Sequence, residues 1–154
     1  MSSNVKRILL VSSSGGVLLE LLALEPWWSR YDSVWAVVKA ADTLSVLAGR
    51  RVHWIRETSI RRPLAIVRSL VQAWRILLRE RPELIVSAGS GPAISFFLAA
   101  RVRGIPTFWV STLNVLTTPG ISAKFCARVA SRVLLQQPSM LGAHPSGIVI
   151  GELY

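Results

Sequence analysis

Two short glycine-containing turns hold the residues of this sequence that are best suited to bind an anion. The first turn is Ser12-Ser13-Ser14-Gly15-Gly16 and the second is Ala88-Gly89-Ser90-Gly91-Pro92, and each follows an apolar run of strand length. Where such a turn leads into a helix, unpaired backbone N–H groups and the helix dipole point toward a phosphate or carboxylate, and glycine lets the ligand approach closely. A plain strand-to-helix connection is the alternative, because the full dinucleotide-binding pattern is absent. The candidate phosphate-binding residues are Ser13, Ser14, Gly15, Gly16, Ser87, Gly89, Ser90 and Gly91.

Side chains for acid–base, nucleophilic or metal chemistry are few. Glu20 lies four residues beyond Gly16 and is the one carboxylate near a glycine turn, so it is the candidate catalytic base; a salt link or a solvated helix face is the alternative. His53 lies within a strand pattern and His144 in a loop, neither with an evident partner, so both are expected to be structural or exposed. Cys126 falls on the apolar side of a predicted helix, which is typical of a buried, inert thiol. No metal-ligand spacing is present, and we predict neither a metal nor a cofactor.

Strand-like and helix-like segments alternate along the chain, which predicts one α/β domain with a mostly parallel, Rossmann-like sheet and helices on both faces. The predicted strands are residues 5–11, 33–38, 51–55, 84–87, 107–110, 133–135 and 147–150. The predicted helices are residues 17–24, stopped by Pro26; 42–47, a short helix or turn with Asp42 as N-cap; 63–81; 93–102, ended by Gly104; and 121–131. Ligands collect at the carboxyl ends of such strands, where both glycine turns lie. The polar segment 110–120 either lines the same cleft or is an ordinary connection.

The charge is strongly positive and unevenly distributed. The formal net charge is +10, nine of the 18 basic residues lie between Arg50 and Arg81, and Glu152 is the only acidic residue after Glu83. This asymmetry indicates a polyanionic partner, such as nucleic acid, anionic lipid headgroups or a diphosphate substrate. A merely solvated arginine-rich surface is the alternative.

The predicted helix 63–81 combines a basic stripe with a wide apolar face. Arg68, Gln72, Arg75 and Arg79 fall on one stripe, and apolar residues, including Trp74, cover the rest. A helix that lies at a bilayer surface has this pattern, although a core helix with one solvated edge would show it too. The candidate membrane-contacting residues are Arg68, Trp74, Arg75 and Arg79.

No apolar run is long enough to span a membrane. The best candidate, residues 84–100, is interrupted by serine, glycine and proline, and residues 5–11 are too short for a signal peptide. A single cysteine precludes an internal disulfide and fits a reducing compartment. We therefore expect a cytoplasmic protein, peripheral on the cytoplasmic face of a membrane.

Several motifs in order along the chain resemble the acceptor-side subunit of two-subunit GT-B glycosyltransferases. This family includes the membrane-recruiting subunit of the dolichol-linked UDP-N-acetylglucosamine transferase and PssD-type polysaccharide biosynthesis proteins. The segments that carry the resemblance are residues 8–16, Leu18 with Glu20, residues 42–45, the more specific residues 80–93, and the closing residues 151–154.

The resemblance implies that residues 1–154 form a single acceptor-binding domain, similar to the N-terminal half of MurG. It further implies a non-autonomous hexosyltransferase subunit that pairs with a donor-binding chain. The implied ligands are a lipid-diphosphate-linked saccharide and an anionic membrane surface, and the implied pathway is polysaccharide or oligosaccharide biosynthesis.

One residue departs from the family pattern at a consequential position. The family usually has a histidine, a candidate general base, directly after the paired glycines, whereas this chain has Val17. Residues 110–112 also lack the acid that many members carry after the fifth strand. Either Glu20 or the partner supplies the base, or the chain retains only binding and scaffolding.

Two other classes of function remain as alternatives. A basic α/β nucleic-acid-binding domain is disfavoured, because the arginines lie on a largely apolar helix and the common recognition signatures are missing, so no nucleic acid is expected as a partner. A nucleotide-binding Rossmann domain is disfavoured because neither Asp32 nor Asp42 falls at the end of the second predicted strand, where a ribose-binding acid belongs.

Overall fold

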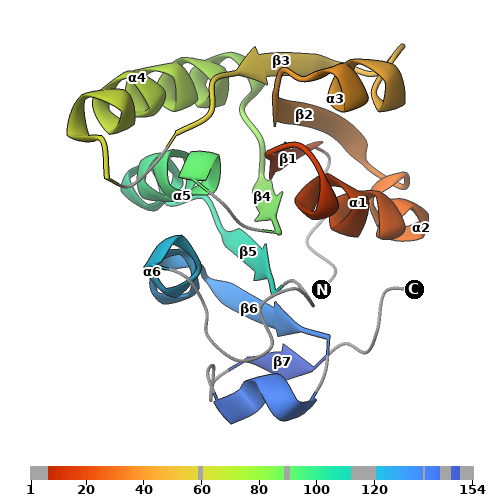
Figure 1. Cartoon of the computed structure of the whole chain (residues 1–154), viewed down its shortest axis with the longest axis vertical. Coiled ribbons are helices and arrows are strands. Elements are labelled where there is room, and N and C mark those ends of the chain that lie inside the picture. The colour runs from red at the N-terminus through yellow and green to blue at the C-terminus, as the bar shows by residue number, and fades with distance from the viewer. Residues whose placement is uncertain are drawn as a thin grey trace.

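A seven-stranded sheet forms the centre of the computed structural model, which describes residues 7–58, 61–88, 91–111, 121–136, 138–142 and 147–149 (Figure 1). The strand order is β3-β2-β1-β4-β5-β6-β7, and every neighbouring pair is parallel. The predicted Rossmann-like parallel sheet is therefore confirmed. The strands are β1 (Arg7–Ser12), β2 (Asp32–Val38), β3 (Val52–Ile55), β4 (Leu84–Ser87), β5 (Thr107–Val110), β6 (Arg132–Leu135) and β7 (Ile148–Val149).

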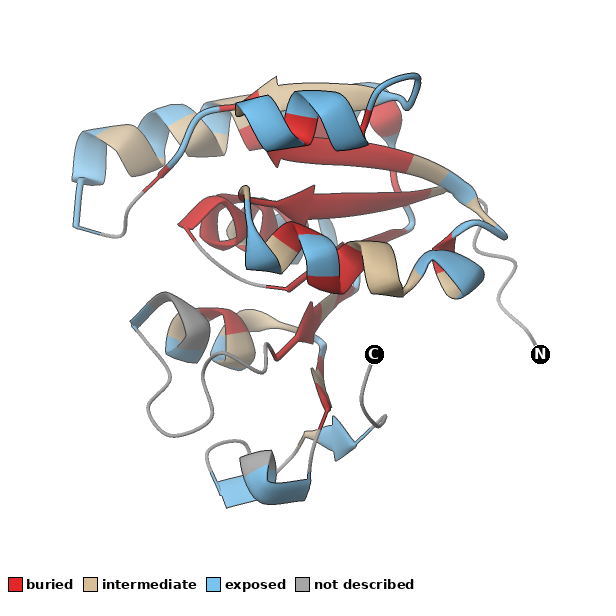
Figure 2. Ribbon diagram, turned by 45° about the vertical axis from the view of Figure 1, so that its right-hand side comes forward, coloured by how far each residue is buried: buried red, intermediate tan, exposed pale blue. Residues whose placement is uncertain are grey.

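Helices cover both faces of the sheet, as predicted (Figure 1). Alternate residues of β1 face opposite layers, so that Leu9 packs in one hydrophobic cluster and Leu10 in the other. Figure 2 shows the central strands buried and much of the outward helical surface exposed. One face carries α1 (Gly16–Ala23), α2 (Glu25–Trp28) and α3 (Ala41–Val46); the other carries α4 (Pro63–Glu80), α5 (Gly91–Arg103) and α6 (Ile121–Val129).

The direction of strand addition reverses at β1, which pairs with β2 on one side and β4 on the other. Val11 lies opposite Ser87, so the two glycine turns leave the sheet from neighbouring strand ends. This reversal is the topological switch point at which ligands bind in open α/β sheets. The backbone thus brings together two segments that are more than seventy positions apart in the sequence.

Helix ends follow the sequence signals in some places and not in others. Helix α4 ends at Glu80, where Arg81 adopts a left-handed conformation (φ 48°) just before Pro82, and Gly104 (φ 70°) follows α5 as predicted. Helix α1 ends at Ala23, before Pro26, as predicted, but Pro26 lies in the first turn of α2, a short helix that was not predicted. The N–H group that proline lacks would have no acceptor within the helix at this position. A 3₁₀ helix that was not predicted, η2 (Pro138–Gly142), follows β6.

The start of α3 corrects a second prediction. Asp42 is not the N-cap; Ala40 occupies that position, and the backbone N–H of Ala40 donates to Thr43 Oγ1 at 2.8 Å. The buried Thr43 hydroxyl in turn donates to the carbonyl of Val38 at 2.9 Å. Asp42 lies in the first turn of α3 and is thus available for another contact.

A buried carboxylate joins α4 to two strands. Glu80 accepts contacts from His53 Nε2 at 2.6 Å and from Arg51 Nη2 at 2.8 Å, and Arg7 Nη1 lies at 3.6 Å. Arg7 also pairs with Asp32 at 2.6 Å. The sequence showed no evident partner for His53; the fold supplies Glu80, in keeping with the expected structural role.

Within the part of the chain that the structure describes, no helix is both long enough and apolar enough to cross a bilayer.

Candidate functional site

The glycine turn after β1 has a backbone conformation that requires glycine. Gly15 is the N-cap of α1, with φ 79° and ψ −141°, and a Cβ at this position would meet no atom within 4 Å. Any other residue would be strained there although space is available. The exposed Gly15 and Gly16 thus border open space at the start of a helix, as an anion site requires.

An internal carboxylate already occupies one amide of this turn. The backbone N–H of Gly15 donates to Oδ2 of Asp42 at 3.1 Å. Sequence reasoning missed this contact, because Asp42 lies 27 residues away and only the sheet brings α3 beside the turn. The contact shows that the turn can hold a carboxylate oxygen.

The serines of the predicted phosphate site are less accessible than the glycines of the first turn. The Ser13 side chain is buried, and its hydroxyl donates to the carbonyl of Ser14 at 3.4 Å. Ser87 is fully buried at the end of β4, and Gly91 is buried in the first turn of α5 rather than in a loop. Gly89 and Ser90 lie outside the described residues. The surface that the structure offers to a ligand here consists of Ser14, Gly15 and Gly16.

Glu20 lies in a buried polar cluster and not on a solvated helix face. Its side chain is 2% exposed, and Nε2 of Gln136 donates to Oε2 of Glu20. The same Nε2 donates to the carbonyl of Ser111 at 2.8 Å, which places the cluster at the carboxyl ends of β5 and β6. Among the described residues, Oε1 of Gln136 is buried without a hydrogen-bond partner. The cluster therefore retains one acceptor oxygen that no donor of the described residues contacts.

Sequence reasoning did not identify Gln136, although one signal was available. Gln136 directly follows an apolar strand, and polar residues at the carboxyl ends of parallel strands are positioned for ligands. Its partner Glu20 is 116 residues away, so the pairing itself depends on the fold.

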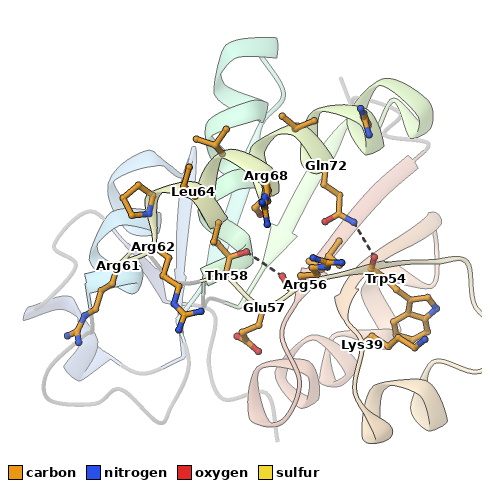
Figure 3. Close-up of a pocket in the computed structure, with 17 residues that line it drawn as sticks. Lys39, Trp54, Arg56, Glu57, Thr58, Arg61, Arg62, Leu64, Arg68 and Gln72 are labelled. Atoms are coloured by element: carbon orange, nitrogen blue, oxygen red, sulfur yellow. Dashed lines mark hydrogen bonds between the residues drawn. The ribbon is translucent and has the colours of Figure 1, made fainter.

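A large basic pocket lies at the ends of β2 and β3, beside the start of α4 (Figure 3). Its volume is about 1100 Å³, and Trp54, Ile55, Leu64 and Val67 contribute apolar surface. The excess of basic residues between Arg50 and Arg81 was the sequence signal for this region, but the sequence did not show that they surround a cavity. Glu57 is the one acidic residue of the described lining, against six basic ones: Lys39, Arg56, Arg61, Arg62, Arg68 and Arg75.

Helix α4 exposes apolar side chains beside this pocket. Trp74 is 38% exposed, and the guanidinium carbon of Arg103 lies over its ring at 5.4 Å from the centroid. An apolar groove of about 540 Å³ runs from Trp74 to Leu98 and Val102 of α5. The structure thus places Arg68, Trp74, Arg75 and Arg79 on exposed parts of α4. The other exposed apolar residues of this helix are Leu64, Val67, Val71 and Leu78.

Cys126 is fully buried, and its desolvation raises the pKa of the thiol to about 12, so the thiol is inert as expected. The described residues contain no group of three or more His, Cys, Asp or Glu side chains placed to hold a metal ion. His144 lies outside the described residues.

Comparisons with known proteins find similarity to glycosyltransferases and to UDP-N-acetylglucosamine 2-epimerases. No family model matches the chain. A curated relative from Mannheimia succiniciproducens, UDP-N-acetylglucosamine–N-acetylmuramyl-(pentapeptide) pyrophosphoryl-undecaprenol N-acetylglucosamine transferase, is 24% identical over 99% of this chain and 45% of its own length. The same enzyme from Bordetella petrii is 33% identical over 58% of this chain and 24% of its length.

The structure also superposes on solved structures with the same architecture. Acinetobacter baumannii MurG matches with a TM-score of 0.77 at 19% identity, over 94% of this chain and 45% of that protein. The fold is that of one Rossmann-like half of a GT-B enzyme. UDP-N-acetylglucosamine 2-epimerase from Rickettsia bellii has a similar half, with a TM-score of 0.73 at 10% identity, over 97% of this chain and 46% of the epimerase.

The matches cover only part of each relative. The chain spans less than half the length of the curated relatives that it matches. Because a GT-B enzyme has two such halves, the 154 residues account for one half.

Proposed function

We propose that this chain is the acceptor-binding, membrane-associated subunit of a bipartite UDP-sugar glycosyltransferase. Its acceptor would be a saccharide linked to a lipid diphosphate, in polysaccharide or oligosaccharide biosynthesis. The observation that carries the proposal is the position of the first glycine turn, with the exposed Gly15 and Gly16, at the switch point of a MurG-like GT-B half. The relatives are named as transferases that act on a pyrophosphoryl-undecaprenol acceptor, and a diphosphate is the class of ligand that such a turn suits.

The bipartite arrangement rests on the sequence resemblance. The donor half of the enzyme lies outside these 154 residues. We assign it to a separate donor-binding chain, with which this protein forms a heterodimer at the cytoplasmic face of a membrane. The exposed apolar and arginine side chains of α4 support the membrane contact.

Sugar transfer requires a proton acceptor. The acceptor hydroxyl attacks the anomeric carbon, the bond from that carbon to UDP breaks, UDP leaves, and the hydroxyl proton passes to a base. Val17 cannot accept a proton. We assign Glu20 as the base supplied by this chain and Gln136 as the residue that orients it, because Nε2 of Gln136 holds Oε2 of Glu20.

A binding experiment with one glycine variant and its control tests the acceptor site. Gly16→Val places bulk at the exposed start of α1, so we expect weaker binding of a short-chain lipid-diphosphate saccharide by calorimetry, with the circular dichroism spectrum unchanged. Gly142→Val is the matched control. A Cβ at Gly142 would meet no atom within 4 Å, and Gly142 lies in η2, away from β1.

Binding and transfer assays distinguish the alternative functions. Equal acceptor affinity of the folded Gly16→Val protein would contradict the site. Saturable binding of a free dinucleotide would favour the nucleotide-binding class, and salt-sensitive binding of DNA would favour the nucleic-acid class. Transfer from a UDP-sugar by the purified chain alone would contradict the bipartite arrangement.

A further inference from the structure

We propose that α4 docks an amphipathic helix of a partner protein, one with apolar residues in a heptad repeat and acidic residues along one flank. The docking surface, which we call the α4 seam, is a row of apolar side chains that are 38% to 78% exposed: Leu64, Val67, Val71, Trp74 and Leu78. This role does not require that the chain take part in sugar transfer.

The spacing along the α4 seam is typical of a helix that packs against another helix. Successive members are separated by 3, 4, 3 and 4 residues, as are positions a and d of a heptad repeat. At about 100° per residue they fall within an arc of about 80°. This is narrower than the arc of about 100° or more with which a surface helix usually faces a core, and it favours a second helix as the occupant.

The α4 seam is separate from the face that α4 packs on its own domain. Ala73, Ile76 and Leu77 are buried in the hydrophobic cluster that α4 shares with the sheet and α5. A helix that needs only one covered side has one apolar face, with polar residues opposite. Because α4 has a second apolar face, we infer that it is covered on two sides in the assembled protein.

A groove beside the α4 seam offers a recess for the side chains of a partner helix. It has a volume of about 540 Å³ and lies between α4 and α5, which pack side by side (Figure 1). Leu70 of α4 and Leu98 and Val102 of α5 line it together with Trp74 of the seam. Helices pack by inserting a ridge of side chains into such a groove. A bilayer surface presents no ridge of this kind.

The charges along the α4 seam specify the chemistry of the partner. Arg68 and Arg75 lie seven residues apart, so they occupy the same heptad position and border the seam on the same flank. Among the described residues, neither of them forms an ion pair. Charges at the flanking positions of paired helices determine which partner is chosen. Two arginines in register on one flank match a helix that carries Glu or Asp in the same register.

The same charges disfavour a second copy of this chain as the occupant. Each copy has a formal net charge of +10, so two copies repel one another, whereas an acidic helix is attracted. The isolated chain leaves this face open to a bilayer, and the partner helix takes the place of that contact in the complex.

A designed peptide in lipid-free solution tests the proposal. The probe has three heptads, about 21 residues, with leucine at a and d, glutamate at both flanking positions and alanine or glutamine elsewhere. Repulsion between the glutamates keeps the peptide from pairing with itself. Titrated with the full chain, the fluorescently labelled peptide should bind with micromolar affinity and become helical. A peptide of the same composition with the leucines moved out of the heptad register should bind at least about 10-fold more weakly.

Substitutions in the α4 seam locate the bound peptide. Val67→Ser/Val71→Ser should weaken binding about 30-fold, because both side chains are half exposed and lose the contact that docking adds. The matched control is Leu19→Ser/Leu44→Ser, which changes two exposed apolar residues of α1 and α3 and should leave the affinity unchanged. Equal losses in the two folded variants would mean non-specific hydrophobic adhesion and would overturn the proposal.

A charge exchange tests the acidic flank and guards against misfolding. Arg68→Glu/Arg75→Glu should bind the glutamate peptide about 10-fold more weakly and should bind a lysine-substituted peptide better than the unmodified chain does. A misfolded variant would bind neither peptide. If the variant and the unmodified chain show the same preference between the two peptides, the arginines do not select the partner and the acidic helix is wrong.

The other occupants of the α4 seam have outcomes of their own. A dimer in analytical ultracentrifugation that Val67→Ser/Val71→Ser abolishes would assign the seam to a second copy and overturn the proposal. Binding to anionic vesicles that depends on Val67 and Val71, without binding of the peptide, would leave only a lipid contact and would also overturn it. Because the peptide is tested without lipid, its binding can succeed even where the proposed membrane contact fails.

Discussion

Glu20 is buried, is paired with Gln136 at the carboxyl ends of the strands, and lies three residues after Val17, which cannot accept a proton. In the assembled transferase, Glu20→Gln should lower kcat by about 10²–10⁴-fold with a smaller change in KM, because general-base catalysis contributes about that much. Glu20→Asp should restore part of the rate and of the pH profile. An unchanged kcat in Glu20→Gln would assign the base to the partner chain.

Cys126 illustrates how burial controls a reactive group. Desolvation raises the pKa of its thiol from 9.0 to about 12. Since the unfolded chain loses this proton at a lower pH than the folded chain, the stabilising contribution is complete below pH 9 and is lost as the pH rises toward 12.

Two measurements check the prediction for Cys126. The thiol should react with a disulfide reagent at neutral pH only after denaturation in urea. The decline of the free energy of unfolding above pH 9 should be less steep in Cys126→Ala than in the unmodified chain. Rapid labelling of the native protein would contradict the buried position.

Among the elements, α4 contacts the sheet through the buried Glu80 as well as through Ala73, Ile76 and Leu77. Glu80 has no exposed side-chain surface, and Arg51 and His53 converge on it. Glu80→Ala should lower the free energy of unfolding by about 2 kcal/mol, because Arg51 and His53 lose their partner. The loss is moderate because Arg51 is half exposed, so water can solvate its guanidinium group in the variant. Urea denaturation measures this loss.

The exposed pair of Glu25 and Arg50 is the control for Glu80. These two residues lie 3.5 Å apart, with Glu25 more than half exposed. Glu25→Ala should therefore change the free energy of unfolding by less than about 1 kcal/mol. Equal losses in the two variants would show that the Glu80 cluster adds nothing beyond a surface contact.

The outer face of α4 should bind membranes through two forces that respond differently to salt. Replacing Arg68, Arg75 and Arg79 by glutamine should remove about 3 kcal/mol of attraction to anionic vesicles at low salt, and less as salt screens the charges. Trp74→Ala should remove about 1 kcal/mol at every salt concentration, because only part of the ring is exposed for contact. Vesicle binding across a salt series distinguishes the two; if the triple variant binds as well as the unmodified chain at low salt, α4 is not the membrane contact.

At the scale of the whole molecule, the order of strands and helices could be predicted from the sequence because each strand is a short apolar run between polar turns. Residues 84–87 and 107–110 were predicted with the bounds that the structure shows for β4 and β5. Local signals failed where a tertiary contact decided the outcome. Asp42 resembles an N-cap in the sequence, but the proximity of α3 to the first turn gives it the Gly15 amide instead.

The candidate site was less predictable than the fold. The glycine turns are continuous segments and could be found by inspection, whereas Glu20 and Gln136 lie on opposite ends of the sequence. The basic pocket combines Lys39, residues 54–58 and the start of α4, so its charges become a cavity only after three segments are packed together. The pattern of arginines predicted an anionic partner and a contact on the helix 63–81, but not the cavity at the start of that helix.

The contact between Asp42 and the Gly15 amide has a consequence for selectivity. An anion that binds this amide has to replace a carboxylate of the same chain, so binding is an exchange of one negative group for another. A singly charged carboxylate ligand gains little from this exchange, because the tethered competitor is always present at high local concentration. A diphosphate carries more charge and more acceptor oxygens, and can contact neighbouring amides as well. We therefore expect the turn to keep its shape in the absence of ligand and to favour anions of higher valence.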